Sequence, residues 1–166
     1  MITIYTDGAC SGNPGSGGFG VAIYEDEKLI TSFSKHTKET TNNREELKAI
    51  ISALEFISTL PSKESFAIEE IKIYSDSAYC VNICNNWIYS WEKNNWTRSK
   101  GQKIENLDLI QNLYKYLTKD NEAFIISIEK VPGHAGIEGN ELADKLARGI
   151  IEPDADDFYF KIVWRK

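Results

Sequence analysis

Short apolar runs alternate with stretches of helical periodicity along this chain. Apolar runs bounded by turn residues are typical of strands, whereas apolar residues that recur every three to four positions are typical of amphipathic helices. Between the first two predicted strands, residues 8–18 hold five of the eleven glycines, and we expect a turn-rich loop there. The pattern predicts strands over residues 2–6, 19–24, 29–34, 71–75 and 124–130, and helices over residues 43–58, 77–89, 104–118 and 138–150.

The order of these elements predicts the fold class. Three strands joined by turns come first, and helices and strands then alternate, which gives the order βββαβαβα. Turn-linked strands pair antiparallel and helix-linked strands pair parallel, so we expect an α/β fold: a five-stranded mixed sheet with helices on both faces. We interpret residues 1–150 as a single domain, because no repeat or low-complexity linker divides them. Residues 151–166 form an acidic C-terminal tail, whose end is compatible with a short strand or an arm.

Composition and charge exclude several classes of protein. The formal net charge of −6 argues against a polycation that coats nucleic acid, although a local basic patch is compatible with it. No apolar run approaches the roughly 18 residues that span a bilayer, and the first residues lack the features of a signal peptide. Cys10, Cys80 and Cys84 include no Cys-x-x-Cys pair, so we expect free thiols in a reducing compartment. We therefore expect a cytoplasmic protein without a membrane partner.

Three aspartates stand where the sequence allows more than one role. Asp7 follows the first predicted strand and precedes Gly8, which is also typical of a simple turn. Asp76 follows the fourth strand, where it would either cap the next helix or lie at the sheet edge that binds ligands in open α/β folds. Asp144 lies opposite the apolar stripe of the last helix, and taken alone it is typical of a surface charge.

Glu46 is a more informative acidic residue. On a helical projection it lies beside Ile50 at the edge of the core-facing stripe, where a carboxylate needs a partner, either a basic side chain or a metal ion. Glu45 falls outside that stripe, and we expect it on a solvated helix face. If the first and fourth strands are neighbours, Asp7 and Asp76 emerge side by side, and converging carboxylates would repel one another without a cation. Oxygen ligands suit Mg²⁺ or Mn²⁺, and two such ions can clamp a phosphodiester during in-line displacement.

Five sequence blocks add a family resemblance. They are TDGACSGNPGSGGFG (6–20), TTNNREEL (40–47), YSDSAY (74–79), WIYSWEKNNW (87–96) and GHAGIEGNELADKLA (133–147). In this order and spacing, they make the chain similar to type 1 ribonucleases H over residues 1 to about 150. A lone Asp-Gly is weak evidence, but five blocks in register are specific. The resemblance implies a ribonuclease H-like fold, which agrees with the element order above.

The resemblance also implies a catalytic set of four carboxylates. Asp7, Glu46, Asp76 and Asp144 match the family's metal ligands, with Glu46 rather than Glu45 in that place. By this resemblance Asp7 would bridge two Mg²⁺ ions when substrate is bound, and Mn²⁺ would substitute for them. Asp144 would help to hold the ion that activates water, while Glu46 and Asp76 would hold the other.

The implied activity is that of a two-metal-ion endoribonuclease on RNA–DNA hybrids. The RNA strand would be hydrolysed to leave 3′-hydroxyl and 5′-phosphate ends, with the hybrid duplex as partner and the protein acting as a monomer. His134 matches a mobile histidine that assists proton transfer or product departure, although alone it would be an ordinary loop histidine. His36 matches no functional position, and we expect it on the surface.

Further residues match substrate-binding positions of the family. Asn and Thr are also common turn and helix-cap residues, and tryptophans four apart are common in helix packing. Asn13, Asn42 and Asn43 would hydrogen-bond in the minor groove of the hybrid, and Thr41 would bind a phosphate of the DNA strand. The tryptophans and basic residues within residues 87–103 match a protruding basic handle of the family, which would bind the backbone of the hybrid. Glu92, Asn94 and Asn95 dilute the charge of this handle. The predicted binding residues are Gly8, Asn13, Thr41, Asn42, Asn43, Trp87, Trp91, Lys93, Trp96, Arg98 and Lys100.

Three other classes of protein were weighed against this interpretation. A resolvase or transposase core shares acidic clusters, but the GHAG and TTNNR blocks have no reason to accompany it, and no DNA-binding domain is attached. A non-catalytic hybrid-binding module would favour Lys or Arg where the carboxylates stand. A domain of a reverse transcriptase is compatible with the blocks, although Met1 lies just before the first strand, which favours a free-standing protein.

Overall fold

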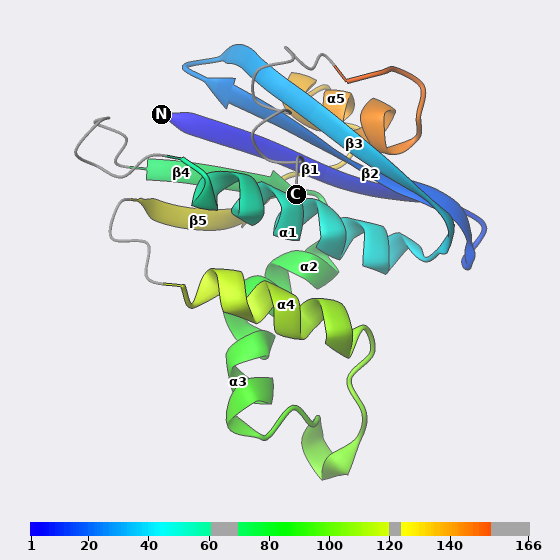
Figure 1. Ribbon diagram of the computed structural model, residues 1–166, viewed down its shortest axis with the longest axis vertical. Coiled ribbons are helices and arrows are strands. Elements are labelled where there is room, and N and C mark those ends of the chain that lie inside the picture. Colours follow the sequence, from blue (N-terminus) through cyan, green and yellow to red (C-terminus); the bar gives the residue numbers. More distant parts are fainter. Residues whose placement is uncertain (61–69, 120–123, 154–166) are drawn as a thin grey trace.

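A computed structural model shows one mixed sheet with the strand order β3–β2–β1–β4–β5 (Figure 1). The structure describes residues 1–60, 70–119 and 124–153. Antiparallel pairs join β1, β2 and β3, whereas β4 pairs parallel with both β1 and β5, so the predicted fold class is confirmed. The strands are β1 (Ile2–Ser11), β2 (Gly15–Glu25), β3 (Lys28–Thr40), β4 (Glu70–Ser75) and β5 (Ile125–Lys130).

Helices cover both faces of this sheet. The long helix α1 lies across one face and α5 lies across the other (Figure 1). A helical segment after β4 leads away from the sheet and returns through α4, which lies beside α1. The helices are α1 (Asn42–Ser58), α2 (Ala78–Asn82), the π-helical turn η1 (Ile83–Trp87), α3 (Ile88–Lys93), the 3₁₀ turn η2 (Ser99–Gly101), α4 (Leu107–Leu117) and α5 (Glu138–Ala147).

The first hairpin is much longer than predicted, and the predicted loop over residues 8–18 is wrong. Asp7 does not end β1, because the strand pairs with β2 without interruption from Ile2 to Ser11. Four of the five glycines, Gly8, Gly15, Gly17 and Gly18, are strand residues, whereas Gly12, with a φ of 82°, lies in the turn between the strands. A Cβ on Gly18 would lie 2.8 Å from the carbonyl oxygen of Ala147 in α5. The glycines of this stretch therefore indicate close packing on the strands as well as a short turn.

The helix boundaries also differ from the predicted ones. The helix predicted over residues 77–89 continues to Lys93 through the π-helical turn η1. Its N-cap is Ser77, whose hydroxyl accepts a hydrogen bond from the Cys80 N–H at 3.2 Å, so Asp76 is not the cap. Helix α5 ends at Ala147, before Gly149 adopts a positive φ of 68°, and Ile150 is 55% exposed rather than part of a helical stripe.

The hydrophobic core lies between the sheet and the helices. Cys80 and Cys84 are buried in it as free thiols, and burial raises the pKa of the Cys84 thiol to about 12. None of the helices in the described parts of the chain has the length and apolar character of a membrane span. The tail from residue 154 onward lies outside the described residues. Fully buried large side chains are Ile4, Ile23, Leu47, Ile50, Ile57, Ile71, Ile73, Ile83, Ile88, Ile110, Leu113 and Leu146.

Candidate active site

The site forms where β1 runs on past the end of β4. The two strands pair in parallel from Ile2 opposite Ile71 to Thr6 opposite Ser75, and there β4 ends. Asp7 and Asp76 are the next residues of their chains. They therefore emerge side by side, as the sequence predicts for neighbouring first and fourth strands. Beyond this point no strand among the described residues pairs with β1 on that side, so the sheet is open to side chains from both faces.

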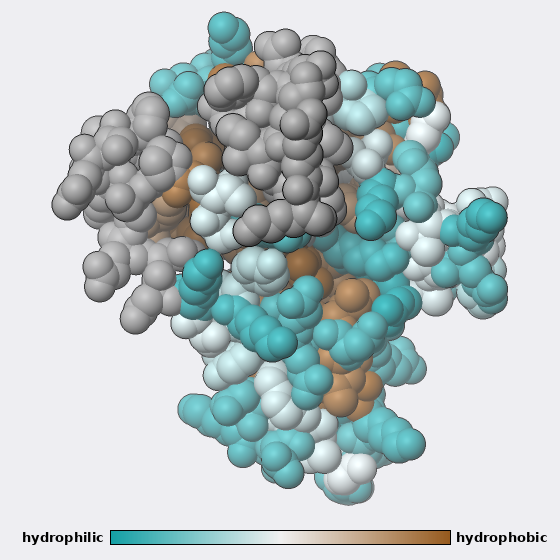
Figure 2. All heavy atoms as spheres, in the orientation of Figure 1, coloured by the Kyte–Doolittle hydropathy of each residue, from teal (hydrophilic) through white to brown (hydrophobic). Residues whose placement is uncertain are grey.

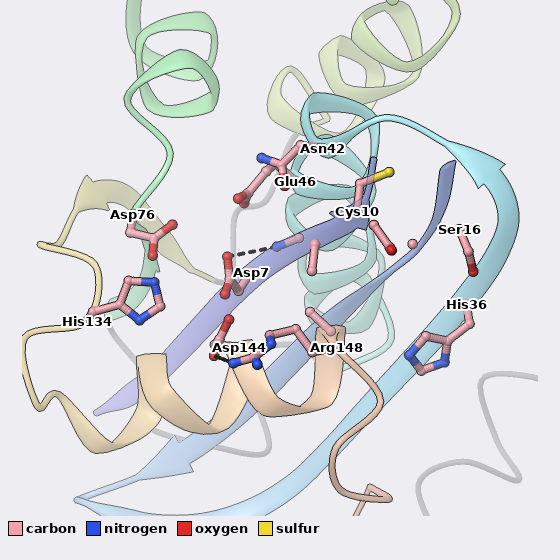
Figure 3. Close-up of a pocket in the computed structure, with 15 residues that line it drawn as sticks. Asp7, Cys10, Ser16, His36, Asn42, Glu46, Asp76, His134, Asp144 and Arg148 are labelled. Atoms are coloured by element: carbon pink, nitrogen blue, oxygen red, sulfur yellow. Dashed lines mark hydrogen bonds and ion pairs between the residues drawn. The ribbon is translucent and has the colours of Figure 1, made fainter. Parts of the chain in front are cut away.

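Glu46 and Asp144 reach this opening from helices on opposite faces of the sheet. Figure 3 shows Glu46 of α1 on one side of Asp7 and Asp144 of α5 on the other. One carboxylate oxygen from each of Asp7, Glu46 and Asp76 lies within 4.8 Å of the other two. Asp144 does not belong to that tight group, but it lines the same cavity, whose volume is about 630 Å³. The structure thus brings all four predicted carboxylates to one cavity.

Gly8 fixes how closely α1 approaches β1 at this place. Its N–H donates to Oδ1 of Asp7 at 2.9 Å, which orients the carboxylate next to it. A Cβ on Gly8 would lie 2.6 Å from the carbonyl carbon of Glu45 and 2.9 Å from the Cα of Glu46, closer than any real Cβ contact. Gly8 is one of the predicted substrate-binding residues, and the close approach that the structure shows at Gly8 is that of α1.

Two of the three clustered carboxylates, Asp7 and Glu46, have raised pKa values. Burial raises the pKa of Asp7 to about 7, assisted by the nearby charge of Asp76 and more weakly by that of Asp144. Burial and the charges of Asp7 and Asp76 raise the pKa of Glu46 well above its ordinary value. Oε2 of Glu46 is buried without a hydrogen-bond partner in the described structure. Such a set of oxygen ligands fits a divalent metal ion, which would satisfy the orphan oxygen and neutralise the repulsion.

A loop after β5 completes the cavity beside Asp76. Asn140, a buried residue of α5, donates from Nδ2 to Oδ2 of Asp76 at 3.3 Å and so orients that carboxylate. Gly133 lies against the same carboxylate, because a Cβ there would be 2.8 Å from Oδ2 of Asp76. The next residue, His134, is exposed with a φ of 51° and lines the cavity opposite the helix α1 (Figure 3). The exposed imidazole is therefore positioned near the cluster without being buried in it.

Glu45 contradicts the prediction of a solvated position. It is fully buried, and its Oε1 accepts hydrogen bonds from Thr40 Oγ1 at 2.7 Å and from Lys48 Nζ at 2.6 Å. Lys48 also donates to Thr37 Oγ1 at 3.2 Å. The helical projection failed because it counts only neighbours on the same helix, whereas the end of β3 folds over this side of α1.

The predicted groove-binding residues come together at two adjacent turns. The backbone N–H of Asn42 donates to Oδ1 of Asn13 at 3.0 Å, which links the β1–β2 turn to the start of α1. Thr41 is the N-cap of α1 and accepts from the Arg44 N–H at 3.3 Å. Asn42 and Asn43 are exposed, and Asn42 lines the cavity. Their cap and turn functions are thus compatible with presenting polar groups beside the carboxylates.

The predicted handle, residues 87–103, protrudes from the body below α4 (Figure 1). Trp87 is 43% exposed, and its ring lies tilted against that of Trp91 with the centroids 6.0 Å apart. Trp91 packs on the core, so helix packing explains its position. Trp96 lies edge-on against Tyr114 at 5.3 Å. The face shown in Figure 2 is mostly hydrophilic over this segment, with an apolar strip beside it.

A second cavity, of about 370 Å³, opens at the base of the handle. Three of the predicted binding residues, Trp87, Trp91 and Arg98, line it together with Tyr79, Ile104 and Glu105. Lys93 and Lys100 are exposed and do not line it. An aromatic cavity with one guanidinium is suited to a sugar–phosphate backbone.

Several residues that line the cavity or, like Asn140, orient a residue that lines it are not predicted from the sequence. Asn140 shares the arc of Ala143 and Ala147, so a polar residue on the buried stripe of α5 was a usable signal. His36 is exposed as predicted, yet it also lines the main cavity. Cys10, Ser16 and Arg148 join that cavity through the long hairpin and the end of α5, and no periodicity indicated them.

The fold and the site define an open-sheet α/β protein with a carboxylate cluster that could hold a metal ion. Sequence comparison gives the family. The profile of the RNase H family matches residues 1–152, so the chain belongs to that family. Ribonuclease H of Caldicellulosiruptor saccharolyticus is 43% identical over 154 residues, covering 91% of this chain and 96% of that protein. Ribonuclease HI of Haemophilus influenzae is 40% identical over 158 residues, covering 95% and 94% respectively.

A solved structure agrees with this assignment. The crystal structure of LC9-RNase H1, described as a type 1 RNase H with the type 2 active-site motif, superposes with a TM-score of 0.75 at 27% identity. The match covers 99% of this chain and 81% of that one. The resemblance to type 1 ribonucleases H that the five sequence blocks indicate is thereby confirmed.

Proposed function

We propose that this chain is an endoribonuclease that hydrolyses the RNA strand of RNA–DNA hybrids and leaves 3′-hydroxyl and 5′-phosphate ends. The observation that carries the proposal is the convergence of Asp7, Glu46 and Asp76, within 4.8 Å, in a member of the RNase H family. Three adjacent carboxylates, two buried and one half-buried, are unfavourable for folding unless a cation neutralises them, so their presence supports metal-dependent chemistry.

Asp7, Glu46, Asp76 and Asp144 would hold the metal ions, two of them when substrate is present. Mg²⁺ suits this all-oxygen set, and Mn²⁺ would substitute for it. When bound, the ions supply an activated water and neutralise charge on the phosphate undergoing in-line displacement. The orphan Oε2 of Glu46 is the protein atom that most clearly lacks a partner in this cavity.

The remaining residues of the site would act through protons and positioning. The exposed His134, in the loop beside Asp76, would exchange a proton with the reacting oxygens or assist the departure of product. Asn140 would keep Asp76 oriented through its 3.3 Å hydrogen bond. Gly8 would keep α1, and with it Glu46, against Asp7.

The hybrid duplex would be bound by the turns beside the cavity and by the handle. Asn13, Asn42 and Asn43 would hydrogen-bond in the minor groove, where the 2′-hydroxyls of one strand identify RNA. Thr41 would bind a phosphate of the DNA strand. Residues of the handle would bind the backbone of the duplex further along, and the negative charge of Glu92 among them would limit the affinity. The handle residues that would bind are Trp87, Trp91, Lys93, Trp96, Arg98 and Lys100.

We propose further that residues 1–150 form the catalytic domain and that the protein acts as a monomer in the cytoplasm. The RNase H match over residues 1–152 supports the first part of this proposal. Two free thiols buried in the core are compatible with a reducing compartment. Sedimentation at increasing protein concentration would test the monomer, because a dimer would show a concentration-dependent mass.

Cleavage of three duplexes of matched sequence tests the proposed function. RNA–DNA, RNA–RNA and DNA–DNA duplexes labelled on each strand would be incubated with Mg²⁺ or with EDTA. We expect cuts only in the RNA strand of the hybrid, only with Mg²⁺, and with 5′-phosphate on the products. The variant Asp7→Asn serves as the control for contaminating nucleases. Cutting of the DNA duplex at a comparable rate would instead favour a resolvase-like or transposase-like activity.

A further inference from the structure

Arg148 is a basic residue that lines the carboxylate cavity. It is the residue that caps the C-terminus of α5, directly after the buried Ala147, and its side chain turns into the cavity (Figure 3). Among the described residues that line this cavity, four are acidic and Arg148 is the only Lys or Arg. Any polyanion that reaches the carboxylates therefore meets one fixed positive charge beside them.

The bond that holds Arg148 is weak and leaves most of its donors available. Its Nη1 donates to Oδ2 of Asp144 at 3.2 Å, a single and rather long contact for a charged pair. The side chain of Arg148 is 52% exposed, and exposed pairs of this kind contribute little to stability. A guanidinium carries five N–H donors in a planar fork that matches phosphate oxygens. Replacing the hydrogen bond from Arg148 to Asp144 by one to a phosphate oxygen therefore costs little free energy.

The shape of the cavity shows which part of a substrate passes Arg148. From the carboxylates the cavity continues past Arg148 to Ser16 on β2 and His36 on β3 (Figure 3). A strand whose scissile phosphate lies at Asp7 and leaves in this direction places a neighbouring phosphate near the guanidinium. That phosphate is not among those the four carboxylates and their ions would neutralise.

We propose that Arg148 binds a phosphate of the RNA strand next to the bond that is cut, and that it leaves Asp144 to do so. The inference rests on the proposed function and adds to it a substrate contact on the α5 side of the cavity. In the free protein the same guanidinium partly neutralises Asp144, so one side chain serves the carboxylate before binding and the phosphate afterwards.

Hybrid binding without turnover tests this assignment. Dissociation constants would be measured in EDTA over a series of salt concentrations for the wild type, Arg148→Ala, Arg148→Lys and Lys145→Ala. Lys145 is the matched control, because it is an exposed cation on the same helix that does not line the cavity. We expect Arg148→Ala to bind about tenfold more weakly and to lower the salt slope by about 0.9, the value of one phosphate contact. Arg148→Lys should keep the slope but bind less tightly, and Lys145→Ala should match the wild type.

A neutral methylphosphonate placed at successive positions of the RNA strand locates the contact. At one position near the cut, the methylphosphonate should weaken binding by the wild type and leave binding by Arg148→Ala unchanged. Equal binding and equal salt slopes for wild type and Arg148→Ala would overturn the inference, as would a loss confined to kcat in Mg²⁺. Cleavage of the hybrid by the wild type is scored separately, so failure of the proposed function is distinguishable from failure of this contact. Melting curves would verify that both Arg148 variants are folded.

Discussion

The Cα of Gly8 in β1 lies directly against the backbone of Glu46 in α1. A Cβ added to Gly8 would be 2.9 Å from the Cα of Glu46 and closer still to its nitrogen. This contact allows α1 to pack so closely on β1 that the side chain of Glu46 reaches Asp7. The close pairing of two carboxylates therefore depends on a residue that has no side chain.

Gly8→Ala should lower both stability and activity. The added methyl group must displace helix backbone rather than a flexible side chain, and we expect a loss of about 1–3 kcal/mol in the free energy of unfolding. Gly101→Ala is the comparison, because a Cβ at Gly101 meets nothing within 4 Å and only its φ of 69° is unfavourable. Urea unfolding of both variants measures the difference. Equal losses would show that the contact with Glu46 can relax freely.

Asp7→Asn should abolish cleavage and flatten the pH dependence of stability. The pKa of Asp7 is raised from 3.8 to about 7, so the folded protein binds a proton that the unfolded chain has lost in this range. The stabilising contribution is fully present below about pH 4 and is lost as the pH rises to about 7. In EDTA, wild-type stability should therefore fall across this window, and Asp7→Asn should fall less. Denaturation at several pH values decides this, and parallel curves would contradict the pKa shift.

The ion pair between the buried Glu45 and the half-buried Lys48 should matter for stability, contrary to what the sequence predicts for Glu45. Glu45→Gln weakens charge-assisted hydrogen bonds from Thr40 and Lys48 and should cost about 1–3 kcal/mol. Lys48→Met leaves the carboxylate buried without its cation and should cost more than the double variant Glu45→Met/Lys48→Met. A double-mutant cycle from unfolding curves measures this coupling. A silent Glu45→Gln would mean that the pair is irrelevant to folding.

His134→Ala should slow turnover without abolishing it. Positioned proton-transfer groups typically contribute roughly 10²–10⁴-fold to the rate, while the carboxylates and their metal ions remain. Because His134 is exposed, the change should leave the fold intact. Steady-state kinetics on the hybrid in Mg²⁺ would show a lower kcat. A change confined to KM would place His134 in binding rather than in chemistry.

Lys93→Ala should raise KM and leave kcat nearly unchanged, because a contact made equally in the ground and transition states affects only binding. The side chain is exposed on the protruding handle, away from the carboxylate cavity. Its effect should fade as salt rises, since counterion release supplies its contribution. Kinetics at two salt concentrations test this prediction, with Lys115→Ala on α4 as a charge-matched control. A lower kcat at saturating substrate would contradict the binding role.

Much of the fold follows from local pattern. Alternating apolar positions and helical spacing predict the elements in their correct order, and that order is enough for a mixed sheet. The positions of Asp7 and Asp76 after two predicted parallel neighbours predict their proximity, because each directly follows the last paired residue of its strand, although β1 itself continues to Ser11. The prediction fails at the glycines of the first hairpin. Local propensity treats them as turn residues, whereas α1 and α5 pass over them as parts of long strands.

Periodicity and motif spacing are properties of residues close together in the chain. They were enough to predict the order of the elements, the family and which acidic residues form the cluster. Tertiary structure alone decided that Glu45 is buried under β3, that β1 outruns β4 beside Asp7, and that Arg148 turns toward Asp144. Each of these depends on segments far apart in the chain meeting at one place. Burial and charge pairing depend on such long-range contacts, so they cannot be predicted from the sequence of one helix or strand.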